Sequence, residues 1–347
     1  MSETDNESLS EATALRVGLI ADADEAPRYA EAVRRCSGLE LCASAGMPQD
    51  VAPGGVDWYD DTRVLIAQGG VDVMVTGSSP RVGAALGEMA AEHSLHVWQP
   101  PPLGRNFAEA IEAARRLKTT ETAYRVASWW EHVGAQVRWA LEFEPGCKPL
   151  FSEVQVSAPG PALQSWRSSQ VDAGGGVLAF DAYAALEALT AIRGLPESVA
   201  GTIAKCRSSS TGAPRETEDV AIAILRYEDG GVACVRAAWD IPPPVQITLH
   251  HGSKLSVRYD DNSAAVLDRD GRLIEERLLP PGFLAAEMER LVAEITGQPD
   301  REAAAAAIER HLAVSALLEA IYLSARTEHP EIPRRLFEVQ KWPQPER

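Results

Sequence analysis

The feature that most constrains the fold is a regular alternation of short β-rich runs and amphipathic helical runs in the first third of the chain. The apolar runs predict strands, and the stretches between and after them carry apolar residues at helical spacing. The predicted strands are 16–20, 39–45, 71–76 and 96–99, and the predicted helices are 27–35, 61–68, 81–93 and 106–118. Strands that alternate with helices build βαβ units, so we predict a parallel, doubly wound sheet of the Rossmann-like α/β class.

The pattern changes near residue 123. A predicted helix at 130–143 precedes a strand at 150–157, and a long helix follows the glycine triplet Gly174–Gly176. The next predicted strands have little helix between them: 198–208, 218–227, 232–239, 246–251, 254–260, 263–267 and 272–278. Two connections contain Asp-Gly, at 229–230 and 270–271, which favours hairpins. We therefore predict an α+β part with an open, mostly antiparallel sheet, closed by helices at 283–296 and 302–326.

These two patterns predict two domains behind a short tail. Residues 1–14 carry four acids and no base, which indicates a disordered acidic tail. The Rossmann-like domain is expected at 15–122 and the C-terminal domain at 123–347.

Charge and composition exclude several classes of partner. Fifty acidic and 33 basic residues give a formal net charge of −17, whereas nucleic acid and anionic membranes attract basic surfaces. No apolar run approaches the roughly 18 residues of a membrane span, and no signal peptide is recognisable. The five cysteines form neither a CxxC pair nor a Cys/His cluster, so no metal site is expected. The expected location is cytoplasmic.

Six segments, in their order and spacing, carry a resemblance to a known family. They are RVGLI at 16–20, AEAVRRCSGLELCASA at 30–45, VDVMVTGSSP at 71–80, HVWQPPPLGRN at 96–106, WRSSQVDAGGGVLAFDAYAALEAL at 166–189 and ETEDVAIAILRYEDGGVACVRAAW at 216–239. Together they resemble the glucose–fructose oxidoreductase / inositol dehydrogenase (Gfo/Idh/MocA) family over nearly the whole chain. The resemblance implies an NAD(P)-dependent oxidoreductase that acts on a sugar, polyol or related hydroxyl compound.

The phosphate loop of that family is altered in this sequence. The family pattern G-x-G-x-x-G falls on Ala21, Asp22, Ala23, Asp24, Glu25 and Ala26. The missing glycines would allow a tight turn and close approach of the backbone to the pyrophosphate. The acids oppose an anion at a helix N-terminus. Asp24 and Glu25 also have a structural interpretation, because acids cap helix N-termini and favour the helix dipole. This vestigial loop makes NAD(P) binding doubtful.

The positions that carry catalysis in the family are altered as well. Its Glu-Lys-Pro motif aligns with residues 100–102, so the family lysine falls on Pro101, which cannot transfer a proton. Counting from Gly174, the family histidine falls on Ala184 and the aspartate after it on Glu187. No histidine lies between residues 132 and 250 to replace it. No catalytic residue is therefore expected.

Two residues remain as fallback acid/base groups, and two as candidates for the substrate cleft. Tyr183 is one position from Ala184, and Asp181 is one position from the residue that aligns with a family aspartate. Arg167 would either anchor a ligand carboxylate or form a salt bridge with a neighbouring acid. Trp130 belongs to a Trp-Trp-Glu-His run in which at most one tryptophan can face a cleft, the alternative being interface packing.

Three functional hypotheses follow. The leading one is a non-catalytic or altered paralogue that needs no cofactor and pairs through its C-terminal sheet with itself or with an active relative, as the resemblance implies. The second is a working oxidoreductase that holds NAD(P) in an atypical way. The third is a ligand-sensing or scaffold protein that binds a small, sugar-like molecule in the old cleft.

Overall fold

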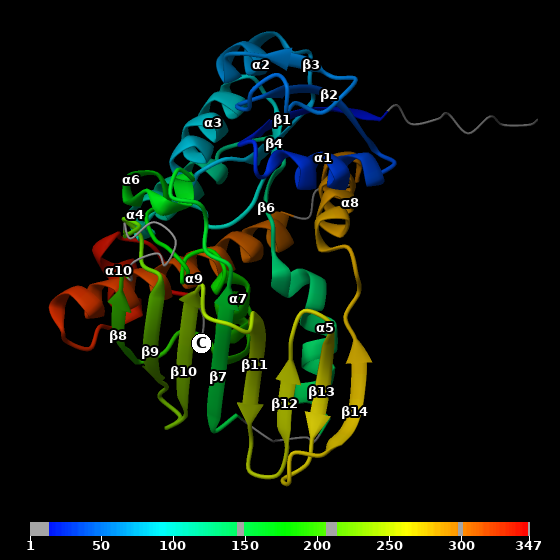
Figure 1. Cartoon of the computed structure of the whole chain (residues 1–347). Helices are drawn as coiled ribbons and strands as arrows, with labels where there is room; N and C mark the ends of the chain where they lie inside the picture. The colour runs from blue at the N-terminus through cyan, green and yellow to red at the C-terminus, as the bar shows by residue number, and fades with distance from the viewer. Residues whose placement is uncertain (1–13, 144–148, 206–213, 298–300, 346–347) are drawn as a thin grey trace, which may run out of the picture.

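The N-terminal part of the computed structural model is a six-stranded parallel sheet with helices on both faces (Figure 1). The structure describes residues 14–143, 149–205, 214–297 and 301–345. In spatial order the strands are β3 (Asp57–Tyr59), β2 (Leu39–Ala45), β1 (Leu15–Ala21), β4 (Val73–Gly77), β5 (His96–Gln99) and β6 (Tyr124–Val126). The helices between them are α1 (Ala26–Arg35), α2 (Thr62–Gln68), α3 (Pro80–Glu92) and α4 (Phe107–Leu117). The direction of winding reverses between β1 and β4, as in a doubly wound fold.

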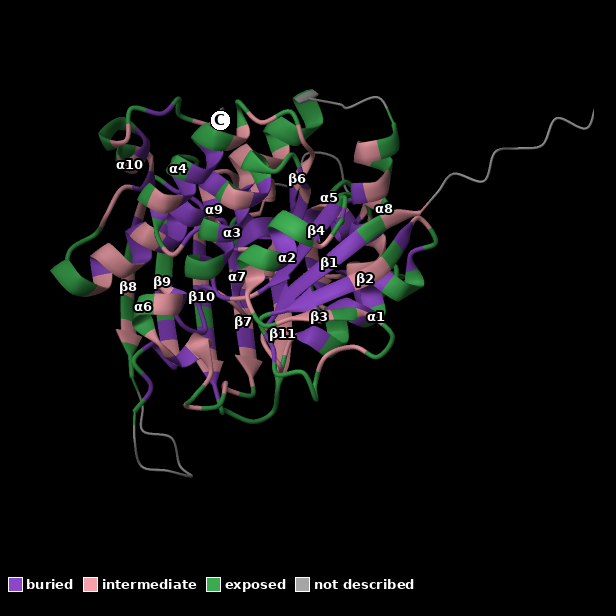
Figure 2. Ribbon diagram, turned by 90° about the horizontal axis from the view of Figure 1, so that it is seen from above, coloured by how far each residue is buried: buried purple, intermediate pink, exposed green. Residues whose placement is uncertain are grey.

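The central strands of this sheet are buried on both faces. All five residues of β4 and the last five of β1 are buried, and Figure 2 shows these strands as largely buried. Such continuous apolar runs are typical of parallel strands covered by helices on both sides. One face packs against α1, and the other against α2 and α3. The Rossmann-like prediction is confirmed.

The C-terminal part is an eight-stranded, mostly antiparallel sheet. In spatial order its strands are β14 (Leu273–Leu278), β13 (Ser263–Leu267), β12 (Ser256–Tyr259), β11 (Val245–His251), β7 (Phe151–Ala158), β10 (Val232–Trp239), β9 (Val220–Arg226) and β8 (Ser198–Ala204). The helices of this part are α5 (Trp129–Leu141), η1 (Trp166–Ser168), α6 (Gln170–Ala173), α7 (Tyr183–Arg193), α8 (Phe283–Thr296), α9 (Arg301–Thr327) and α10 (Pro333–Val339). Helices α5, α7 and α9 pack against the buried face of the sheet.

The predicted hairpins are present, and one strand pair differs from the antiparallel pattern. The Asp-Gly turns lie between β9 and β10 and between β13 and β14, and Gly230 and Gly271 have positive φ angles of 83° and 77°. Strands β7 and β10 pair in parallel. After β7 the chain leaves the sheet through the glycine triplet and α7, and it returns to the sheet at β8. The sheet is therefore mixed.

Several short elements were not predicted from the sequence. Strands β3 and β6 have three residues each, and α6 has four, so none of them carries a full hydrophobic period. Strand β6 extends the N-terminal sheet to Val126, while the division at 122/123 stays a prediction. Residues 1–13 of the expected acidic tail lie outside the described residues.

Helix α8 belongs to the C-terminal part of the sequence but packs on the N-terminal part, beside α1 (Figure 1). Met288 and Leu291 are fully buried in the same apolar cluster as β1 and α1. A Cβ added to Gly38, just after α1, would lie 2.8 Å from Val292 of α8. This close contact fixes α8 against the parallel sheet and so positions the two parts relative to each other.

Among the described helices, none combines the length and the apolar character that a bilayer span requires.

Candidate functional site

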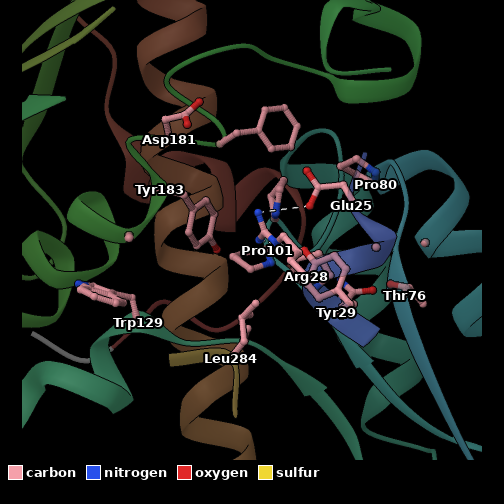
Figure 3. Close-up of a pocket in the computed structure, with 18 of the residues that line it drawn as sticks. Glu25, Arg28, Tyr29, Thr76, Pro80, Pro101, Trp129, Asp181, Tyr183 and Leu284 are labelled. Atoms are coloured by element: carbon pink, nitrogen blue, oxygen red, sulfur yellow. Dashed lines mark hydrogen bonds and ion pairs between the residues drawn. The ribbon is translucent and has the colours of Figure 1, made fainter. Parts of the chain in front are cut away.

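A cavity of about 320 Å³, here called the central cavity, lies where the two parts meet (Figure 3). From the parallel sheet it is lined by the segments after β4 and β5. From the C-terminal part it is lined by the start of α5 and by residues 166–187. Ligands of open α/β sheets bind at the carboxyl ends of the strands near the switch point, which is where the central cavity lies.

The two positions that the family resemblance assigns to lysine and histidine both line the central cavity. Pro101 reaches it from the segment after β5, and Ala184 from the first turn of α7. The fallback residues Tyr183 and Asp181 line it as well, and so does Glu187. The fold thus brings these positions together, but among the described lining residues there is no lysine and no histidine.

Tyr183 is buried, and its hydroxyl is bound by a distant histidine. The phenol oxygen lies 2.9 Å from Nδ1 of His311 in α9, and the two rings stack with centroids 6.0 Å apart. Burial holds the pKa of the Tyr183 hydroxyl well above its ordinary value and lowers the pKa of His311 to about 4. His311 is therefore neutral near pH 7 and can accept the phenolic proton in a hydrogen bond.

Two of the carboxyl groups that line the central cavity, those of Asp181 and Glu187, are also held by protein partners. Oδ2 of Asp181 accepts a hydrogen bond of 2.7 Å from the Trp239 indole. Glu187 accepts hydrogen bonds from the Ser128 hydroxyl and from the backbone N–H of Trp130. Burial raises the pKa of Asp181 and raises that of Glu187 to about 7. Glu187 consequently exchanges its proton close to neutral pH.

The vestigial phosphate loop forms a closed turn. The carbonyl of Asp22 accepts hydrogen bonds from the N–H groups of Glu25 and Ala26, at 3.0 and 2.9 Å. Glu25 is the N-cap residue of α1, but its side chain makes no capping hydrogen bond, so the capping role expected for the acids is not found for Glu25. Its carboxylate points away from the helix end because it has stronger partners elsewhere.

The Glu25 carboxylate is paired with Arg167 across the central cavity and with Arg28 of α1. We call these three residues the Glu25 clasp. Nη2 of Arg167 lies 2.9 Å from one oxygen of Glu25, and Nη1 of Arg28 lies 3.3 Å from the other. The salt bridge considered for Arg167 is therefore present. Figure 3 shows Glu25, Arg28 and Tyr29 on one side of the cavity, with Tyr183 and Trp129 on the other. The clasp joins the β1–α1 turn to the segment before α6.

Two further contacts hold the same segment. Nη1 of Arg81 in α3 lies 3.0 Å from Asp172, and Arg105 donates a hydrogen bond of 2.6 Å to the carbonyl of Val171. Residues 166–172 are thus tied to the parallel sheet at three places.

The β1–α1 turn does not fit the pyrophosphate of a dinucleotide. The N–H groups of Glu25 and Ala26, at the start of α1, are already bonded to the carbonyl of Asp22 and so are not free to bind an anion. The acids also crowd one another, because burial and the charges of Glu25 and Asp24 raise the pKa of Asp22 to about 6. A further negative charge 4 Å from one of these acids would cost about 4 kcal/mol at an effective dielectric of 20.

The space beside the turn is filled as well. The buried ring of Tyr29 packs on Trp98 with centroids 5.5 Å apart. A Cβ at Gly77, at the end of β4, would lie 2.4 Å from this ring. Of the positions named in the vestigial loop, Ala21, Ala23 and Ala26 do not line the central cavity, which reaches the loop at Glu25.

The two adjacent tryptophans of α5 point to different places. Trp129 lines the central cavity, whereas Trp130 packs with Val133 and Val137 in a separate core cluster. Arg138 lies over the Trp130 ring, 5.2 Å from its centroid. The sequence analysis named Trp130 as the cleft candidate, whereas in the structure Trp129 lines the central cavity and Trp130 is buried in the core.

Sequence reasoning did not identify His311 or Ser128 as parts of this region. His311 lies 128 positions from Tyr183, and Ser128 lies 59 positions from Glu187. No local motif links such pairs, so only the packing of α5, α7 and α9 brings them together. Within the described ranges, no group of three His, Cys, Asp or Glu side chains is arranged to bind a metal ion.

Comparison with known proteins supports the fold and names a family. Residues 148–258 match the family profile described as GFO/IDH/MocA C-terminal domain. No curated protein matches the sequence. An oxidoreductase from Thermotoga maritima is 18% identical, with a TM-score of 0.76 over 93% of this chain and 99% of that chain.

Two other solved structures are similar. Biliverdin reductase from Synechocystis sp. PCC 6803, in complex with biliverdin and NADP+, is 16% identical, with a TM-score of 0.74 over 90% of this chain and 99% of that chain. A levoglucosan dehydrogenase in complex with NADH and L-sorbose is 18% identical, with a TM-score of 0.73 over 92% and 99%. At these identities the similarity establishes the shared two-domain fold.

Proposed function

We propose that the chain is an altered member of the Gfo/Idh/MocA family that does not use NAD(P) at the usual site and binds a small organic ligand in the central cavity. The observation that carries the proposal is the Glu25 clasp. An acid of the former phosphate loop is paired with Arg167 across the space that a bound nicotinamide nucleotide would have to enter.

The lining of the central cavity supports the same proposal. Pro101 and Ala184 supply no proton donor or acceptor where the family resemblance places lysine and histidine. The cavity nevertheless persists, with a volume at the lower end of the range typical of small-molecule sites. A site that keeps its volume without these groups is suited to binding more than to hydride transfer.

We expect no saturable binding when the full-length protein is titrated with NADH or NADPH and followed by calorimetry and nucleotide fluorescence. The physical reason is the closed turn at Asp22, together with the acids that line the approach to it. Thermal unfolding of the same sample verifies that the protein is folded. Saturable binding with a micromolar dissociation constant would contradict the proposal.

The second candidate function is an oxidoreductase that uses Tyr183 or Asp181 in place of the family histidine. The Tyr183–His311 hydrogen bond favours it, because a phenol bonded to a neutral imidazole has a route for its proton. A crystal grown with NADH separates the two candidates. Nicotinamide density beside Tyr183 would support the oxidoreductase, and an intact Glu25 clasp with no nucleotide would support the altered member.

We also propose that the protein associates through the solvent-facing side of the C-terminal sheet, with a second copy or with an active relative. On β9, Ile222 and Ile224 are 42% and 48% exposed, and Phe151 on the nearby β7 is 37% exposed. Ile222 and Ile224 give this side of β9 two exposed β-branched side chains, and exposed apolar surface of this kind marks protein interfaces.

Replacing Ile224 with glutamate should lower the molar mass measured by light scattering after gel filtration. The added charge would have to be buried without a partner in the interface. Val339→Glu is the matched control, because Val339 is 75% exposed on α10 and lies outside this sheet. An unchanged mass for Ile224→Glu, or a monomeric parent protein, would exclude this interface.

A further inference from the structure

Aromatic rings form much of the wall of the central cavity. Trp129 and Phe283 meet edge to face with centroids 5.4 Å apart, and His132 packs behind Phe283 at 5.5 Å. A second edge-to-face pair, Trp166 and Phe180, has centroids 5.1 Å apart. The Arg167 guanidinium lies over Trp166 and Phe180, 5.4 and 5.5 Å from their centroids, so Trp129 and Phe283 are the rings that a ligand would contact.

Several charged groups of the same wall are engaged by the protein, whereas Asp261 also lines the wall and burial raises the pKa of its carboxyl group. Arg167 is held by Glu25, Asp181 by Trp239, and Glu187 by Ser128 and Trp130. A polyhydroxylated ligand is recognised by wall groups that are free to hydrogen-bond each hydroxyl, and a hydroxyl left unpaired on binding weakens the affinity.

Pro101 and Ala184 remove two more polar positions and replace them with apolar surface. Leu284 adds an aliphatic contact near Trp129 and Pro101 (Figure 3). Gln246, which also lines the cavity, offers one amide to a polar substituent. The wall therefore suits an apolar ring that carries few polar groups.

The volume sets the size of that ring. An apolar cavity of about 150 Å³ holds one benzene molecule. At about 320 Å³, the central cavity has room for two fused rings.

From these observations we infer that the central cavity binds a flat, bicyclic aromatic compound in place of the sugar-like ligand that the family resemblance implies. This inference deepens the proposed function, since it rests on the cavity being a ligand site that works without NAD(P). Trp129 is its main contact residue, with Leu284 and Phe283 beside it.

Indole is the probe, because it has two fused rings and a single N–H group. The full-length protein is titrated with indole by calorimetry and by ligand-observed NMR, and in parallel with sorbitol. We expect saturable binding of indole and none of sorbitol. Trp129→Ala should weaken indole binding about tenfold, the loss of one well-packed aromatic contact. Trp139→Ala, on the same helix but outside the cavity wall, should leave binding unchanged.

Leu284→Glu serves as a second variant if Trp129→Ala does not fold, since it places a charge in the wall at a half-buried position. It should also weaken indole binding. Binding of sorbitol without indole, binding of neither, or indole binding that both variants leave intact would overturn the inference. NADH titration of the same samples keeps the outcomes distinct: nucleotide binding refutes the proposed function, whereas failure of indole alone refutes only the ligand class.

Discussion

Replacing Arg125 with alanine should lower the free energy of unfolding by about 3–5 kcal/mol, the cost of leaving buried charges without their partner. Arg125, on β6, is buried, and its Nε lies 3.1 Å from Oε2 of Glu287 on α8, whose side chain is fully buried. Its other nitrogens pair with Glu131 of α5 and Glu294 of α8. Chemical unfolding in urea or guanidinium at constant pH measures the change.

Arg63→Ala is the matched control for this prediction. Arg63 pairs with Asp61 at the exposed start of α2, and solvent screens such a pair, so its loss should leave the free energy of unfolding nearly unchanged. A free energy of unfolding for Arg125→Ala that is as close to that of the parent protein as the value for Arg63→Ala would show that the buried carboxylates are stabilised without the arginine.

The Arg125 network also links the elements that present residues to the central cavity. Arg290 pairs with Glu287, and Arg310 of α9 pairs with Glu131, so the charges link β6, α5, α8 and α9. The helix that presents Trp129 and the helix that presents Phe283 are thereby tied to the same arginine. Loss of Arg125 should therefore disturb ligand binding as well as stability.

Much of the fold could be predicted because it rests on local patterns. The predicted bounds of β2, β5, β10, β13 and α8 are those of the structure. These segments have clear periodicity and end at turn residues or charged residues, so sequence and packing agree on their limits. The three-residue strands β3 and β6 lack such a pattern and depend on pairing with a neighbouring strand.

The candidate site could be predicted only in outline. Matching the sequence to the family pattern placed Pro101, Ala184, Tyr183 and Asp181, and the fold gathers all four around one cavity. Their partners could not be predicted, because His311 and Trp239 come from distant elements. The partner of the Glu25 side chain could not be predicted either. Its local sequence favours a helix cap, whereas in the structure the carboxylate pairs with Arg167.

The Glu25 clasp and the altered catalytic positions both support the proposed function, and one physical reason connects them. Under the proposed function, a lysine or histidine that assists hydride transfer has no nucleotide on which to act. Replacement of the lysine by Pro101 and of the histidine by Ala184 then leaves an apolar wall. The proposed ring-binding cavity is what remains when the fold is kept and these groups are removed.

The second large effect should be a change in pH dependence on replacing Glu187 with glutamine. Burial raises the pKa of Glu187 from 4.5 to about 7, so the folded protein holds this proton more tightly than the unfolded chain. The contribution of Glu187 to stability is therefore greatest below pH 4.5, falls as the pH rises through 4.5–7, and is constant above that. Over this window the loss is about 3 kcal/mol.

Glutamine cannot ionise, and its amide can still accept from Trp130 and donate to Ser128. The difference in unfolding free energy between Glu187→Gln and the parent protein should therefore shift by about 3 kcal/mol in favour of the variant between pH 4.5 and 8, as measured by urea unfolding at several pH values. Other buried groups contribute equally to both proteins, so their effects on the pH dependence of stability cancel in this difference. They include His250 and His311, whose pKa values are lowered to about 3 and 4 and whose effects have the opposite sign. Glu92→Gln, exposed at the end of α3, is the control and should show no such shift. If the difference for Glu187→Gln stays constant from pH 4.5 to 8, Glu187 has the same pKa in the folded protein as in the unfolded chain. The wall of the central cavity beside Ser128 would then be open to water.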